Sequence, residues 1–144
     1  MPLPVGVAVE RVTDLTSPLA IRAEVFIEGQ GVSLADEVDG RDPDCLHWLM
    51  TDAEGPVATL RVLPIDADRA KVQRVAVLAR ARGRGLGALL MRFVLSDLQL
   101  QGFSRITLGA QVDVIGFYER LGFAAHGPVY DDAGIPHRDM DLTF

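Results

Sequence analysis

Valines occupy every second position from Val5 to Val9, with small or charged residues between them. This period of two predicts a strand over residues 5–12 that buries one of its faces. Ser17 and the proline that follows it are typical of a helix start. The apolar spacing after them predicts a helix over residues 17–28.

The segment over residues 31–44 is rich in acids and in turn-forming residues, and we expect an open loop there. Its charge favours attraction of a cationic substrate, while a solvated loop that protects a sheet edge is an equally good interpretation. The acids lack the alternating ligand spacing and terminal glutamate of a calcium loop, so we expect no calcium site.

Residues 46–78 contain three apolar, β-branched runs separated by two polar turns, which predicts three antiparallel strands in a row. From Leu86 to Leu98 apolar residues recur at helical spacing, and Gly102 ends that helix. The order of elements indicates an α+β fold. The strands predicted after residue 45 span 46–51, 56–65, 71–78, 105–108, 124–130 and 137–142, and a short helix spans 114–121.

Composition and charge restrict the class of protein. With 144 residues, 49% of them hydrophobic, the chain is expected to form one domain over residues 1–144. A net charge of −6 has the wrong sign for binding phosphates along a nucleic acid, so we expect no nucleic-acid partner. Cys45 is the only cysteine and there are three histidines, too few for a Cys/His metal cluster. No stretch approaches the ~18 apolar residues of a membrane span and no leader pattern is seen, so we expect a cytoplasmic protein.

The most informative segment runs from Val75 to Leu90, where a strand ends in a loop with three glycines and a long helix begins. Glycines allow a ligand to approach the backbone, and the first N–H groups of the helix are unpaired. The helix terminus contributes partial positive charge, and Arg80, Arg82 and Arg84 contribute full charges. These features together predict an anion site, with a pyrophosphate as its natural occupant.

Two other nucleotide motifs fail in this segment. Residues 83–88 satisfy the dinucleotide fingerprint G-x-G-x-x-[GA], but that motif needs a parallel βαβ unit and an acid about 20 residues later. Residues 105–108, Arg-Ile-Thr-Leu, occupy that region instead. A Walker loop needs Lys and then Ser or Thr after its last glycine, whereas Gly87 is followed by Ala88 and Leu89.

The loop resembles motif A of the GCN5-related N-acetyltransferases, [RQ]-x-x-G-x-[GA], which stands here as residues 82–87, RGRGLG. That family's later signature, F-Y-x-x-x-G-F, is matched by residues 117–123, and the predicted element order is also the family's. Residues 25–31, His47 and residues 134–137 resemble the ElaA/YjcF-type branch. The resemblance spans nearly the whole chain. It implies a mixed central sheet of about seven strands flanked by three or four helices.

The resemblance also implies an activity, the transfer of an acetyl group from acetyl-CoA to a primary amine by direct attack in a ternary complex. The strands before and after the long helix would splay apart to admit the pantetheine arm, which would pair with the backbone of Val75 and Val77. The N–H region of Val77 would stabilise the oxyanion. Gln111 stands where the family usually has Asn, and Val114 where a small Ala is common. The implied cofactor-binding residues are Val75, Ala76, Val77, Arg82, Gly83, Arg84, Gly85, Leu86, Gly87, Ala88, Gln111 and Phe117.

For the chemistry, the resemblance implies that the Tyr118 hydroxyl protonates the departing thiolate. Glu28, His47 and His137 are the candidates for the base that deprotonates the amine, since imidazole titrates near neutral pH and a carboxylate can act when buried or through a water. Of these we favour Glu28 together with His47. Gln30 and His137 are the candidate acceptor contacts. The acceptor would be a small-molecule or peptide amine, and a homodimer is left open.

Two other functions are compatible with the same fold. One is an acyltransferase like the acyl-homoserine-lactone synthases, although those chains are usually longer. The other is a non-catalytic acyl-CoA-binding module, which would bind the cofactor without turnover.

Overall fold

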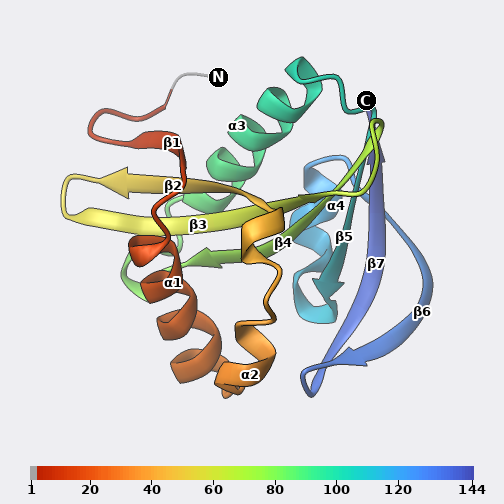
Figure 1. Cartoon of the computed structure of the whole chain (residues 1–144), viewed down its shortest axis with the longest axis horizontal. Coiled ribbons are helices and arrows are strands. Elements are labelled where there is room, and N and C mark those ends of the chain that lie inside the picture. Colours follow the sequence, from red (N-terminus) through yellow and green to blue (C-terminus); the bar gives the residue numbers. More distant parts are fainter. Residues whose placement is uncertain (1–2) are drawn as a thin grey trace.

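A seven-stranded sheet forms the centre of the computed structural model, which describes residues 3–144 (Figure 1). The strands lie in the order β1-β2-β3-β4-β5-β7-β6, and the β4–β5 pair is parallel while the others are antiparallel. This confirms the predicted mixed sheet. The strands are β1 (Ala8–Val12), β2 (Leu46–Asp52), β3 (Gly55–Pro64), β4 (Arg69–Val77), β5 (Arg105–Gln111), β6 (Ala124–Asp132) and β7 (Ile135–Thr143).

Helices cover both faces of the sheet. α1 and the segment after it lie in front of β2 to β4 in Figure 1, and α3 lies behind them. The helix predicted over residues 17–28 is one continuous helical segment whose second half is π-helical. The helices are α1 (Thr16–Arg22), the π-helical η1 (Ala23–Glu28), α2 (Leu34–Glu37), α3 (Leu86–Leu100) and α4 (Ile115–Arg120), with short 3₁₀ turns η2 (Asp42–Asp44), η3 (Ala79–Ala81) and η4 (Val112–Val114).

Alternation along the strands sends side chains to two separate cores. The larger core lies on the α3 side, where Trp48, Met50, Leu90 and Ile106 are fully buried. The smaller core lies on the α1 side and consists of Ile21, Val25, Leu49 and Ala76. Neighbouring residues of β2 enter different cores, so the strand is packed on both of its faces.

β4 and β5 pair over only three residues each and then diverge, as Figure 1 shows. The paired residues are 69–71 of β4 and 105–107 of β5. Further along β4, the register against β3 shifts, and Arg74 adopts a left-handed φ of 57°, which is the local bend expected at a β-bulge. The bulge turns β4 away from β5, so the sheet opens beside residues 75–77.

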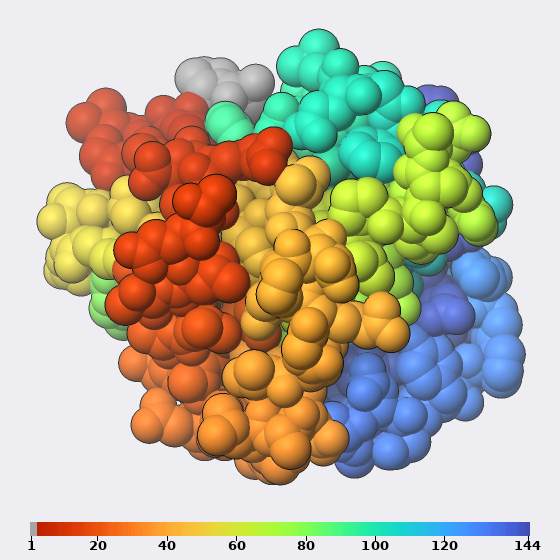
Figure 2. Space-filling view, in the orientation of Figure 1, coloured from red at the N-terminus to blue at the C-terminus, as the bar shows by residue number. Residues whose placement is uncertain are grey.

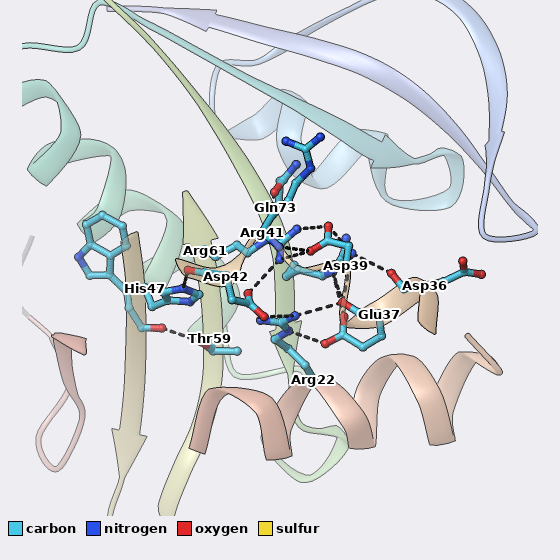
Figure 3. Close-up of polar contacts among 12 residues, drawn as sticks. Arg22, Asp36, Glu37, Asp39, Arg41, Asp42, His47, Thr59, Arg61 and Gln73 are labelled. Atoms are coloured by element: carbon cyan, nitrogen blue, oxygen red, sulfur yellow. Dashed lines mark hydrogen bonds and ion pairs between the residues drawn. The ribbon is translucent and has the colours of Figure 1, made fainter. Parts of the chain in front are cut away.

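The acid-rich segment after η1 is packed, which corrects the expectation of an open loop (Figure 3). Arg22 and Arg61, each with a side chain 1% exposed, are buried beneath it. Arg22 lies 2.6 Å from Glu37 and 2.7 Å from Asp42. Arg61 lies 2.9 Å from Asp42 and 2.7 Å from Asp39. A buried cation is costly without a partner, so these carboxylates are needed inside the fold and are not free to attract a substrate.

Candidate functional site

A cavity of about 720 Å³ occupies the opening between β4 and β5 and extends to the turn between β6 and β7. Its walls come from η1, α2, β4, the loop before α3, β5, α4 and the last two strands. In Figure 2 the segment with α2 (orange) borders the C-terminal strands (blue) on this face of the molecule. One cavity therefore joins the glycine-rich loop to the region where an acceptor was predicted.

The glycine-rich loop has the geometry of an anion site. Gly85 is the N-cap of α3, with a left-handed φ of 72° and no side-chain cap for the first N–H groups of the helix. Gly83 is also left-handed, and a Cβ on either residue would meet nothing within 4 Å. Conformation, rather than space, requires glycine at these two positions. A Cβ on Gly87 would contact Val77 at 3.4 Å and Phe117 at 3.6 Å, so that glycine permits close packing.

Only one of the three loop arginines lines the cavity. Arg82 does so, and its Nε donates a hydrogen bond to the Val77 carbonyl at 3.1 Å. Arg80 and Arg84 instead pair with Asp52 at 3.2 and 3.1 Å. The pKa of Asp52 is lowered to about 2 by the backbone N–H of Glu54 and by both arginines, so it is ionised at neutral pH and pairs with both of them. Arg84 was predicted to bind the cofactor, and it lies outside the cavity wall.

The end of β4 presents backbone groups to the opening. The N–H of Leu78 donates to the Val57 carbonyl at 2.8 Å, and in an antiparallel pair alternate residues bond to the same neighbour. The N–H and C=O of Val77 therefore point toward β5, into the cleft that Val75 and Val77 line. Ala76 is 1% exposed, packs in the smaller core and lies outside the cavity.

Tyr118 lies on α4 with its ring packed edge-on between Phe117 and Phe123, at centroid distances of 5.0 and 6.0 Å. The residue is 8% exposed and lines the cavity. Burial raises the pKa of its hydroxyl to about 12, which keeps it protonated at neutral pH. Within residues 3–144 no side chain or backbone group is hydrogen-bonded to that hydroxyl, so its proton is available to a ligand.

The predicted acceptor contacts meet at the other end of the cavity. Gln30, after η1, and Gln111, at the end of β5, exchange hydrogen bonds of 3.3 and 3.0 Å across it. His137 on β7 lies opposite Gln111 in the strand register and also lines the cavity. Tyr130 on β6 stacks on His137 with ring centroids 6.0 Å apart. Sequence reasoning did not find Tyr130, because a register shift between His126 and Tyr130 sets its position.

The two candidate bases do not line this cavity. His47 is 4% exposed, and its Nε2 lies 2.9 Å from the Asp42 carbonyl, within the packed acidic segment. Glu28 is exposed at the end of η1 and does not contribute to the cavity wall. The structure therefore places neither residue beside Tyr118 or Gln111, and it gives His47 a structural hydrogen bond.

The described residues match neither the pattern of a metal site nor that of a membrane-spanning helix. No group of three or more His, Cys, Asp or Glu side chains with the spacing of a metal site occurs in the part of the chain that the structure describes. Over the same residues, none of the helices has the length and apolar character needed to cross a bilayer.

Comparison with known proteins agrees with this geometry. A family model described as an acetyltransferase (GNAT) domain matches residues 23–144. The uncharacterized N-acetyltransferase YjcF of Bacillus subtilis is 31% identical over 121 residues, which cover 83% of this chain and 86% of YjcF. The crystal structure of Escherichia coli ElaA is 28% identical, with a TM-score of 0.82 over 94% of this chain and 99% of that one.

A second solved structure resembles the chain in fold. It is an acetyltransferase from Elizabethkingia anophelis with acetyl-CoA bound, with a TM-score of 0.75 and 14% identity over 98% of this chain and 100% of that one. Together the matches confirm the resemblance that the two motifs and the outer segments indicated.

Proposed function

Because the chain belongs to the GNAT acetyltransferase family, we propose that it is an acetyl-CoA-dependent N-acetyltransferase that acts on a primary amine. The observation that carries the proposal is the single cavity that connects the uncapped N-terminus of α3 to the acceptor end through the opening between β4 and β5. This arrangement suits an elongated thioester whose diphosphate would lie at the helix N-terminus and whose reacting carbonyl, at the far end of the pantetheine arm, would meet the acceptor.

The loop and strand residues would hold the donor. The first N–H groups of α3 and the Arg82 guanidinium favour the pyrophosphate, because a helix N-terminus and a fixed cation both attract anions. The N–H of Val77 faces the cleft and would donate to the thioester oxygen as it becomes an oxyanion. The pantetheine arm would lie along Val75 and Val77 as an added strand lies along a sheet edge.

Direct attack by the amine is favoured over an acyl-enzyme. The only cysteine, Cys45, does not line the cavity, and burial raises the pKa of its thiol, which disfavours the nucleophilic thiolate. The amine would attack the carbonyl to form the oxyanion, and as the C–S bond then breaks the protonated Tyr118 hydroxyl would deliver a proton to the leaving sulfur.

Calorimetry with CoA tests the donor site. Gly85→Asp places a carboxylate where the phosphates would sit and should abolish measurable binding, while the parent binds. Gly6→Asp is the matched control, because Gly6 has a similar left-handed φ of 81° and lies outside the cavity. Equal affinity for CoA in the parent and in Gly85→Asp would show that the loop is not the cofactor site.

A further inference from the structure

The cavity contains one imidazole among the described residues, and its hydrogen bonding fixes which nitrogen is basic. Nδ1 of His137 lies 2.7 Å from the Ile135 carbonyl. A carbonyl oxygen only accepts hydrogen bonds, so Nδ1 carries the proton and Nε2 carries the lone pair. No hydrogen bond to Nε2 occurs within residues 3–144. The other two histidines, His47 and His126, lie outside the cavity.

Neighbouring residues hold the ring in place. Directly opposed residues of antiparallel strands project to the same face, and the register aligns Gln111, His137 and Tyr130 in one row across β5, β7 and β6. Tyr130 stacks on the imidazole with an interplanar angle of 23°. The Tyr130 hydroxyl donates to Asp139 at 2.7 Å, so that hydroxyl is occupied. His137 therefore has a supported ring and a free basic nitrogen beside the end of β5.

The charged groups around His137 come from several elements. Asp132 on β6 and Asp113 on η4 line the same cavity, and η4 packs against β7. Asp139 is engaged by Tyr130, and the Arg138 guanidinium donates to the Gly127 carbonyl. The surroundings of the imidazole are thus acidic overall, which favours the approach of an ammonium.

We propose that Nε2 of His137 is the general base that takes a proton from the acceptor ammonium. The proposal rests on the acetyl-transfer function above. The ammonium N–H bond breaks, its proton passes to Nε2, and the neutral amine forms the new C–N bond to give a tetrahedral intermediate. As the intermediate collapses, the C–S bond breaks, and Tyr118 protonates the sulfur and recovers a proton from the nitrogen that becomes the amide. The proton on His137 returns to solvent, so one proton is released for each acetyl group transferred.

The test compares the pH dependence of kcat/KM in three proteins: the parent, His137→Gln and His126→Gln. The probes are four primary amines: spermidine, glucosamine, kanamycin and a short peptide with a free α-amine. Release of the CoA thiol reports turnover, and the amine with the highest turnover is used for the profiles. His126 is half exposed and pairs with Asp141, so His126→Gln controls for the loss of a surface imidazole.

An alkyl ammonium titrates near 10, as lysine does, whereas a peptide α-amine titrates near 8, so about one molecule in 10³ of the first and about one in 10 of the second is neutral at pH 7. With an alkyl amine, His137→Gln should therefore lose roughly 10²- to 10³-fold in kcat/KM at pH 7, and with an α-amine up to about tenfold. The deficit should shrink to less than about tenfold at pH 9.5, as the free amine becomes abundant. His126→Gln should follow the parent throughout.

A constant ratio between the parent and His137→Gln at every pH would overturn the proposal, because it would show a packing or positioning role. Undiminished turnover in that variant at pH 7 would overturn it as well. If the parent binds CoA but acetylates none of the four amines, the acetyl-transfer function itself fails, and the base assignment fails with it.

Discussion

Asp42 joins the two buried arginines, and Asp42→Asn tests how much this junction stabilises the fold. One oxygen, Oδ1, lies 2.7 Å from Arg22 and 2.9 Å from Arg61. Breaking a buried ion pair costs about 3–5 kcal/mol, because a buried charge is left uncompensated. Here each arginine keeps a second carboxylate, Glu37 at 2.6 Å and Asp39 at 2.7 Å. We therefore expect the lower end of that range, a loss of about 3 kcal/mol in the free energy of unfolding.

Urea unfolding measures this loss, with the m-value expected to stay constant because the surface exposed on unfolding does not change. The matched control is Asp66→Asn, which neutralises an exposed pair with Arg69 whose side chains are 47% and 48% exposed. Such pairs contribute about 0–1 kcal/mol. A loss below about 1 kcal/mol for Asp42→Asn, or one equal to that of Asp66→Asn, would refute the reasoning.

Three further predictions concern the site and the pH dependence of stability. Tyr118→Phe keeps the ring packing and should lower turnover about 10²- to 10⁴-fold without unfolding the chain, which steady-state rates and a melting curve check together. Arg82→Gln should weaken CoA binding about 10- to 100-fold by calorimetry, the value of a charged hydrogen bond, whereas Arg84→Gln should change it much less because Arg84 pairs with Asp52. Hydrogen bonds from Arg61 lower the pKa of Asp39. This carboxylate contributes to the free energy of unfolding at pH values above about 3.9, the ordinary pKa of Asp, and that contribution should be lost as the pH falls below this value. Measuring the free energy of unfolding across an acid titration should show the fall.

Much of the fold could be predicted from local patterns. Strand alternation, the apolar face of α3 and the glycine-rich turn before it depend on nearby residues, and the structure confirms those elements. The packing of residues 31–44 could not be predicted in the same way. Glu37 and Asp42 of this segment are buried because Arg22 and Arg61, distant in sequence, need them as partners. Nothing in the local pattern distinguishes such an arginine from a surface one.

In the candidate site, too, features set by nearby residues could be predicted and features set by distant residues could not. The glycine-rich loop is a continuous motif that the sequence shows directly, although pairing with Asp52 removes Arg84 from the cavity wall. The acceptor end depends on strand register, which separates His137 from His47. In the sequence, each of these two histidines lies at a predicted strand, and nothing local distinguishes them. Only the pairing of β5 with β7 shows that His137 shares a face with Gln111.

The central claim is tested most directly by two-substrate kinetics with acetyl-CoA and the best amine of the panel, with the product identified by mass. Direct transfer predicts an N-acetylated amine, intersecting double-reciprocal lines and no acetylated protein when acetyl-CoA is supplied alone. Parallel lines with an acetylated protein would contradict direct attack. CoA binding without any acetylated product would contradict the enzymatic function and indicate a binding module instead.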